Sequence, residues 1–208
     1  MTLDNYILSH IDSEPDLLKK LCRDTYVNVL RPRMLSGHLQ GRILKMFCRM
    51  ICPEKVLELG TFTGYSALCI AEGLPENGVV YTIDNNEELE EFVRNYFEQS
   101  PYKNKIRQFT GDALETIKSL NETFDLVFID ADKREYLDYY EAIFDNVNPG
   151  GFIIADNTLW DGKIFETIDP NDKQTIEIMR FNDFIAKDTR IEKVIVPLRD
   201  GLTMIRKK

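Results

Sequence analysis

Hydrophobic and polar positions follow a regular order from Lys55 onwards. Short apolar runs, of the length of buried strands, alternate with longer segments in which apolar residues recur at helical spacing. The expected strands are 56–59, 79–83, 106–109, 126–129 and 152–155, and the expected helices between them are 65–73, 87–99, 113–120 and 134–146. Strands that alternate with helices predict an α/β protein, with a parallel sheet covered by helices on both faces.

The first part of the chain, residues 1–50, is predicted to be helical throughout. Ser13-Glu14-Pro15 suits the start of one helix, with proline in its first turn. Arg31-Pro32 ends that helix, and Ser36-Gly37 opens another that runs to about Met50. These helices therefore precede the alternating pattern as an N-terminal addition to it.

The last part of the chain predicts an antiparallel pair of strands. A helix near 174–187 is followed by apolar runs at 191–198 and 202–206, which flank Arg199-Asp200-Gly201. Asp-Gly between two apolar runs is a hairpin signal. We expect one domain over 1–208, in which residues 55–208 form a sheet completed by this pair.

Bulk composition narrows the possible functions. The chain has 208 residues, enough for a sizeable core, and its net charge of −9 disfavours a nucleic acid as partner. Neither a leader peptide nor a membrane-spanning run is apparent, so we expect a cytoplasmic protein without membrane contact. Its four cysteines are expected to be core thiols rather than zinc ligands, because the only histidines are His10 and His38.

A glycine-bearing turn joins the first expected strand to the next helix. The stretch 55–66 contains Glu58, Gly60 and Gly64, in the pattern G-x-x-x-G with an acid two residues before the first glycine. Free backbone N–H groups at a helix N-terminus bind anions. The acid favours a ligand that also carries an ammonium group, such as the methionine half of S-adenosylmethionine, over a pyrophosphate. The alternative is an ordinary turn between a strand and a helix.

Acids or amides follow each of the five expected parallel strands, where ligands of open α/β sheets bind. Asp84, after the second strand, has close to the spacing from Gly60 at which an acid accepts hydrogen bonds from a ribose diol. Its alternative role is to cap the segment 85–88. Gly111-Asp112-Ala113, after the third strand, would lie near the adenine, unless Asp112 only caps the next helix.

Oxygen-bearing side chains after the fourth and fifth strands form a candidate metal site. Asp130, Asp156 and Asn157 supply hard oxygen ligands, which suit Mg²⁺, Mn²⁺ or Ca²⁺ rather than Zn²⁺. Alternatively, Asp156 and Asn157 only end a strand and start a turn. Lys133 would act as a base beside the metal, unless it is a solvated lysine paired with Asp132 or Glu135.

Three of these stretches together resemble one enzyme family: residues 57–66, 128–133 and 156–162. Along nearly its whole length the chain is similar to the cation-dependent, S-adenosylmethionine-dependent O-methyltransferases, the group of the caffeoyl-CoA and catechol O-methyltransferases. The resemblance implies a Rossmann-like, seven-stranded sheet whose last strand is antiparallel. It also agrees with the alternation of strands and helices described above.

The resemblance implies a role for each matched residue. Asp130, Asp156 and Asn157 would bind the divalent metal, with Asp130 and Lys133 as the catalytic pair and Lys133 as the general base. The residues implied for S-adenosylmethionine are Ser36 or its neighbour Met34, Glu58, Gly60, Thr61, Ser66, Asp84, Ala113 and Asp132. Trp160 and Asp161 would contact the substrate. Asp161 stands where some family members have asparagine, which leaves the identity of the substrate open.

The implied reaction methylates one hydroxyl of a vicinal diol on a small phenolic molecule. A metal would stabilise the ionised hydroxyl, and residues 158–173 would cover the substrate. The N-terminal helices are a candidate surface for a homodimer. The alternative acceptor is a hydroxylated uridine in tRNA, since Arg31-Pro32-Arg33 with His38 and Arg42 is a small basic cluster.

Two other classes of protein compete with this interpretation. A nicotinamide-dependent dehydrogenase would share the architecture, but the chain lacks G-x-G-x-x-G, and no tyrosine is followed by lysine at the fourth position. A non-catalytic binding protein would be free to lose the metal and lysine positions, which are intact here.

Overall fold

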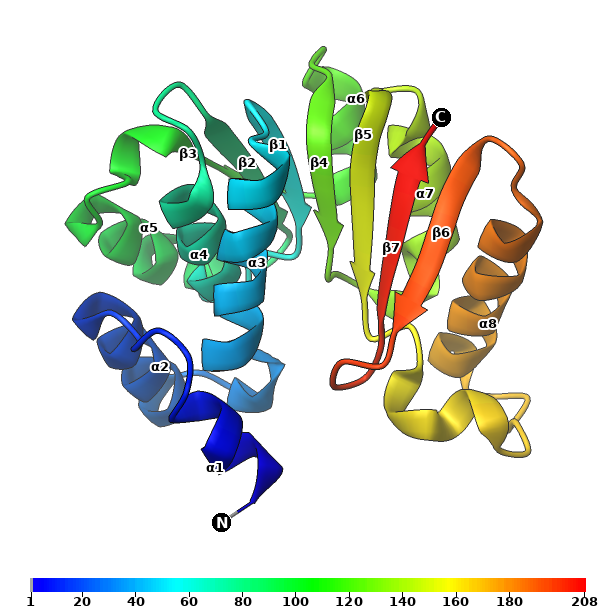
Figure 1. Cartoon of the computed structure of the whole chain (residues 1–208), viewed down its shortest axis with the longest axis horizontal. Coiled ribbons are helices and arrows are strands. Elements are labelled where there is room, and N and C mark those ends of the chain that lie inside the picture. The colour runs from blue at the N-terminus through cyan, green and yellow to red at the C-terminus, as the bar shows by residue number, and fades with distance from the viewer. Residues whose placement is uncertain (1) are drawn as a thin grey trace.

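Seven strands form the central sheet in a computed structural model, which describes residues 2–208 (Figure 1). The strands are β1 (Lys55–Leu59), β2 (Val79–Asp84), β3 (Ile106–Thr110), β4 (Phe124–Ile129), β5 (Val147–Asp156), β6 (Ile191–Val196) and β7 (Leu202–Lys207). Their order in the sheet is β3-β2-β1-β4-β5-β7-β6. Strands β1 to β5 pair in parallel, whereas β7 is antiparallel to β5 and β6. The predicted fold class is therefore confirmed.

The helices lie at the predicted places, with small differences at their ends, but residues 1–50 are not helical throughout, because 9–15 and 29–36 lie outside the α-helices. They are α1 (Leu3–Leu8), α2 (Asp16–Asn28), α3 (Gly37–Ile51), α4 (Tyr65–Gly73), α5 (Glu90–Gln99), α6 (Ala113–Ser119), α7 (Tyr136–Phe144) and α8 (Lys173–Lys187). Pro15 precedes α2 as its N-cap rather than lying in its first turn. The segments predicted to be helical at 87–89 and 134–135 belong to 3₁₀ turns, η2 (Glu87–Leu89) and η4 (Lys133–Glu135).

The parallel strands are buried on both faces, because successive residues of a strand point to opposite sides. Val56 and Leu126 belong to the core under α2, α3, α4 and α5. Leu57 and Val127 belong to the opposite core, under α6, α7 and α8. This double covering explains why the central strands read as continuous apolar runs rather than as alternating ones.

The sheet positions the polar strand ends at one edge. The strand order reverses between β1 and β4, and crevices at such a switch point bind ligands. Leu59 pairs with Ile129, and Ile129 pairs with Ala155. Asp130 and Asp156 each come one residue later, so the register places these two acids beside each other.

The cysteines match the expectation only in part. Cys48 and Cys69 are buried and Cys22 is partly buried, but Cys52 is exposed, so the prediction of a core thiol is wrong at Cys52. Cys52 caps α3 in the left-handed conformation, with φ of 54°, which turns the chain away from the helix. All four thiols are free. Within residues 2–208, no helix has both the length and the apolar character to cross a membrane.

Candidate active site

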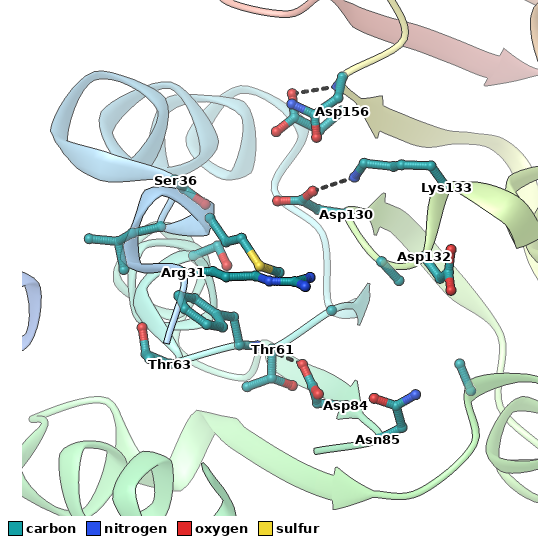
Figure 2. A pocket seen from close by; sticks show the side chains of 18 of the residues that line it. Arg31, Ser36, Thr61, Thr63, Asp84, Asn85, Asp130, Asp132, Lys133 and Asp156 are labelled. Carbon is teal, nitrogen blue, oxygen red and sulfur yellow. Dashed lines mark hydrogen bonds and ion pairs between the residues drawn. The ribbon is translucent and has the colours of Figure 1, made fainter. Parts of the chain in front are cut away.

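A cavity of about 1030 Å³ opens at the carboxyl edge of the sheet. Figure 2 shows Asp84 towards one end of it and Asp156 towards the other, with Asp130 and Lys133 near Asp156. Most residues that the sequence nominated line this cavity: Ser36, Gly60, Thr61, Ser66, Asp84, Ala113, Asp130, Asp132, Lys133, Asp156, Asn157 and Trp160. Met34 lines it too, whereas Glu58 is fully buried and Asp161 lies outside the lining.

The glycine turn is clamped between neighbouring strands. The N–H of Gly60 donates to the carbonyl of Ile83 at 2.9 Å, and the N–H of Asp130 donates to the carbonyl of Leu59 at 2.8 Å. Gly60 has φ of 100°, and a Cβ there would lie 2.1 Å from the carbonyl oxygen of Asp130. Only glycine fits this position, both in conformation and in space. The turn thus packs directly against the strand end that carries Asp130.

Glu58 is a fully buried carboxyl group below this turn. The Thr82 hydroxyl donates to its Oε2 at 2.5 Å, and the hydroxyls of Thr61 and Thr82 lie 2.5 Å apart. Its Oε1 is buried and has no hydrogen-bond partner among the described residues. Burial raises the pKa of Glu58 to about 8. A buried acceptor without a donor is costly, so this oxygen is suited to a ligand's donor group.

Asp84 and Asp112 differ in how they use their carboxylates. Asp84 accepts from the N–H of Phe62 at 2.7 Å and from the N–H of Asn86 at 2.9 Å, which holds it against the glycine turn. The cap of the following η2 is Asn86 rather than Asp84. Asp112 caps α6 by accepting from the N–H of Glu115 at 2.9 Å, so the capping alternative is confirmed for Asp112.

The acidic end of the cavity contains Asp130, Asp156 and Asn157. Asp156 is 5% exposed, and burial together with nearby Asp130 raises its pKa to about 6. Its Oδ1 accepts from the N–H of Asn157 at 2.8 Å. Asn157 has φ of 58°, and its amide nitrogen donates to Asp200 at 3.4 Å. Within residues 2–208 no cluster of three His, Cys, Asp or Glu could hold a metal, so a cation here would need the amide oxygen of Asn157 as its third protein ligand.

Lys133 is buried and faces the acidic end. Its ammonium donates to Asp130 Oδ1 at 2.8 Å and to the Tyr136 hydroxyl at 2.6 Å. Tyr136 is fully buried, which raises its pKa well above the usual value, and its hydroxyl also lies 3.0 Å from the carbonyl oxygen of Asp156. The alternative of a solvated lysine is therefore wrong. Asp132 pairs instead with Arg134, which lowers the pKa of Asp132.

The segment 158–173 contributes one residue, Trp160, to the lining of the cavity. Its indole N–H is buried without a partner in the described part of the chain, and the ammonium of Lys163 lies 5.6 Å from its ring centroid. Asp161 is exposed, with φ of 51°. The structure thus brings Trp160 to the site but leaves Asp161 away from it.

The small basic cluster expected around Arg31 and Arg33 is not assembled. Arg42 is buried and pairs with Glu72 at 2.8 Å, and His38 is bound to the carbonyl of Asp12 at 2.7 Å. Arg31 and Arg33 do line the cavity.

Comparison with known proteins gives the decisive observation. A model of the O-methyltransferase family matches residues 8–208. The chain belongs to the O-methyltransferase family.

Relatives of this O-methyltransferase align over nearly its whole length. It is 33% identical to a caffeoyl-CoA O-methyltransferase from Petroselinum crispum, with 99% of this chain and 90% of that protein covered. It is 32% identical to a probable caffeoyl-CoA O-methyltransferase from Dictyostelium discoideum, with coverage of 98% and 90%.

Solved structures of methyltransferases superpose on nearly the whole chain of this O-methyltransferase. An O-methyltransferase from Bacillus cereus in complex with S-adenosylhomocysteine superposes with a TM-score of 0.92 at 26% identity, with 99% and 97% of the two chains covered. An S-adenosylhomocysteine-bound methyltransferase from Podospora anserina gives 0.90 at 26% identity, with coverage of 99% and 94%. The expected enzyme class, an S-adenosylmethionine-dependent O-methyltransferase, is confirmed, and the interpretation as a dehydrogenase is wrong.

Sequence reasoning missed four residues of the site of this O-methyltransferase: Gln40, Tyr136, Arg199 and Asp200. Gln40 is 2% exposed and reaches Asp156 from α3, while Arg199 and Asp200 line the cavity from the β6–β7 turn. A signal existed for Gln40, because it is a polar residue on the apolar, inward face of a helix. Nothing in the local sequence separates Arg199 and Asp200 from an ordinary hairpin turn.

Proposed function

We propose that this O-methyltransferase transfers the methyl group of S-adenosylmethionine to one hydroxyl of a catechol-like vicinal diol, with the help of a divalent cation. One observation carries the proposal. Asp130 directly follows β4 and Asp156 ends the adjacent β5, and a buried lysine lies against Asp130 in the cavity that the glycine turn also lines.

The residues around the glycine turn fit the methyl donor. The unpartnered Oε1 of Glu58 offers a buried acceptor for the donor's ammonium group. Asp84 has its oxygens at the end of β2, where a ribose diol can donate to them in addition to the two backbone N–H groups. Ala113, at the start of α6, would lie against the adenine. S-adenosylhomocysteine in the related solved structures supports this assignment.

The donor set at the acidic end fits a hard cation. Two carboxylates and one amide oxygen, from Asp130, Asp156 and Asn157, suit Mg²⁺, Mn²⁺ or Ca²⁺ and leave ligand positions for water or substrate. When bound, the cation would supply Lewis-acid stabilisation of an ionised hydroxyl. Asp130 and Asp156 repel each other at this end of the cavity, and a positive charge there would relieve that repulsion.

Lys133 is the candidate for moving the proton. Its ammonium is held between the Asp130 carboxylate and the Tyr136 hydroxyl, so its position is set by two contacts. In the neutral form, Lys133 would accept the proton of the acceptor hydroxyl. The protein would contribute mainly by placing donor methyl and acceptor oxygen in line, which accounts for a large part of the acceleration in such transfers.

A small phenolic acceptor is favoured over tRNA. Trp160 lines the cavity with an unpartnered indole N–H and offers a face for an aromatic ring. Both relatives are named for caffeoyl-CoA, a phenolic thioester, as their acceptor. The net charge of −9 and the pairing of Arg42 with Glu72 leave little positive surface for an RNA backbone.

A homodimer is the assembly that the exposed surface supports. Tyr26, Val27 and Leu30, at the end of α2 and just after it, are 58%, 73% and 86% exposed, and Val194 and Ile195 of β6 are exposed as well. Exposed apolar groups that lie together mark interaction surfaces, and Tyr26, Val27 and Leu30 form such a group at the end of α2. We expect sedimentation equilibrium to give twice the mass of the chain, and Leu30→Glu to shift the enzyme towards the monomer.

The test of the function is release of S-adenosylhomocysteine from S-adenosylmethionine. A simple catechol and total tRNA serve as parallel acceptors, each with Mg²⁺ and with excess chelator. We expect turnover on the catechol that chelator abolishes and that Asp156→Asn lowers. Turnover on tRNA alone would show that the acceptor is a nucleic acid and not a small phenol. Turnover that is unchanged by chelator would contradict the proposed metal site.

A further inference from the structure

The buried side-chain amide of Gln40 lies between Asp156, at the acidic end of the cavity, and Arg199. Gln40 of α3 is 2% exposed, and its Nε2 donates to Asp156 Oδ2 at 2.6 Å. Its Oε1 accepts from Arg199 Nη1 at 2.6 Å. The same guanidinium nitrogen donates to the carbonyl of Ser36, the residue before α3. Three parts of the chain that are distant in sequence therefore meet at one side chain.

The chemistry of the two neighbours fixes which way the amide points. A guanidinium only donates hydrogen bonds, and an ionised carboxylate only accepts them. The amide oxygen must therefore face Arg199, and the amide nitrogen must face Asp156. In the reverse orientation, oxygen would face oxygen and N–H would face N–H, and both hydrogen bonds would be lost in a buried place.

Asp156 is consequently held by both of its oxygens. Oδ1 accepts from the N–H of Asn157 at 2.8 Å, and Oδ2 accepts from Gln40 at 2.6 Å. A carboxylate oxygen can accept more than one contact, so each oxygen keeps capacity for a cation. The amide is neutral, so it orients the carboxylate without cancelling its charge. A direct bond from Arg199 would instead place a positive charge where the cation has to bind.

We propose that Gln40 is a positioning residue, which holds the Asp156 carboxylate for the divalent cation, and that Arg199 acts through Gln40 by fixing the orientation of its amide. The inference rests on the proposed metal site. Partners that orient metal ligands change metal affinity by roughly 10- to 100-fold when they are removed.

The test measures binding of Mn²⁺ alone to the full-length enzyme by calorimetry, without any turnover. We expect Gln40→Leu, which keeps the size of the side chain but removes its hydrogen bonds, to weaken Mn²⁺ binding by roughly 10- to 100-fold. The affinity for S-adenosylhomocysteine, measured in the same preparations, should change less than about twofold, because the hydrogen bonds of Gln40 join Asp156 and Arg199 and not the glycine turn. Gln99→Leu, the same substitution at an exposed position of α5, is the matched control and should leave both affinities unchanged.

Arg199 variants separate the two parts of the proposal. Arg199→Leu frees the amide to rotate and should weaken Mn²⁺ binding, whereas Arg199→Lys keeps a pure donor and should retain most of the affinity. In the double variant Gln40→Leu/Arg199→Leu, the loss should equal that of Gln40→Leu alone, because Arg199 acts only through Gln40.

Three outcomes would overturn the roles assigned to Gln40 and Arg199. Wild-type affinity for Mn²⁺ in Gln40→Leu would show that Asp156 needs no such partner. If Gln40→Leu lowered both the Mn²⁺ affinity and the S-adenosylhomocysteine affinity to a similar extent, and also lowered the melting temperature, Gln40 would have a general structural role. Additive losses in the double variant would show that Arg199 acts independently. Absence of Mn²⁺ binding in the unsubstituted enzyme would instead remove the proposed metal site, and this inference with it.

Discussion

Binding of S-adenosylhomocysteine should become tighter as the pH rises towards 8, because of Glu58. Burial raises the pKa of this carboxyl to about 8, so that about nine in ten copies are protonated in the ligand-free enzyme at pH 7. A bound ammonium group favours the ionised form, so the complex holds fewer protons than the free enzyme does. Ligand binding therefore releases a proton, and the complex gains stability as protons become scarcer.

The size of the effect follows from the same pKa. Ionising Glu58 at pH 7 costs about 1.4 kcal/mol, which weakens binding about tenfold relative to a fully ionised carboxylate. At pH 6 the cost is about 2.7 kcal/mol, or about a hundredfold. We therefore expect the dissociation constant to fall about ninefold from pH 6 to 7 and about fivefold from pH 7 to 8, and to level off above pH 8.

The assay is titration calorimetry with S-adenosylhomocysteine from pH 6 to 8.5, in pairs of buffers with different heats of ionisation. About 0.9 proton should be released for each ligand bound at pH 7. The ligand's own amine is an amino-acid α-amino group beside a free carboxylate, so it stays protonated over most of this pH range, and it titrates equally with any variant of the enzyme. Glu58→Gln, which has no titrating group at this position, is therefore the control.

Comparison of the wild-type enzyme with Glu58→Gln shows whether Glu58 causes the pH dependence. The wild-type enzyme should show the steep pH dependence, and Glu58→Gln should bind more weakly at pH 8 without that dependence below it. Parallel pH curves for the two proteins, or no proton release at pH 7, would refute a protonated Glu58 that ionises to receive the ammonium group.

Three further predictions test the site and the fold. Lys133→Met should lower turnover by roughly 10²- to 10⁴-fold while leaving S-adenosylhomocysteine affinity unchanged in calorimetry, and a loss below tenfold would contradict its role as the base. Gly60→Ala should lower the free energy of unfolding in urea by at least about 2 kcal/mol, since the new Cβ would lie 2.1 Å from the Asp130 carbonyl at a φ of 100°; an unchanged midpoint would refute this clash. Hydrogen bonding to Arg190 lowers the pKa of Asp188 to about 2. The contribution of Asp188 to the free energy of unfolding is therefore complete above its ordinary pKa near 3.9, and it fades as the pH falls towards 2. The stability difference between wild type and Asp188→Asn should therefore be larger at pH 7 than at pH 3, and an equal difference would contradict this linkage.

Much of the fold could be predicted from the chain because its signals are local. The apolar runs predicted all seven strands, and Asp200-Gly201 marked the hairpin that makes β7 antiparallel. The boundaries differed where tertiary packing extended an element. β5 begins at Val147 rather than at 152, because its early residues continue the ladder beside β4, with Val147 paired to Phe124.

The candidate site was less uniformly predictable. Residues that directly follow strands, such as Asp130 and Asp156, could be assigned to one edge, because parallel strands all end on the same side. Asp161 could not be judged in this way, since it lies in an irregular segment at φ of 51°, outside the cavity lining. Gln40 escaped notice because its partner Asp156 is 116 residues away.

The sequence by itself therefore determined the order of the elements and the chemistry at each strand end, since periodicity and turn residues act over a few positions of the chain. Only the tertiary structure decided which charges are buried and how they pair. Lys133 faces Asp130 rather than solvent, and Arg42 forms an ion pair with Glu72. Glu58 has one carboxylate oxygen without a hydrogen-bond partner among the described residues. For Arg42, the outcome depends on how α3 is rotated against its neighbours, because a small rotation changes which side chain reaches the interior. The periodicity of a single segment does not specify that rotation.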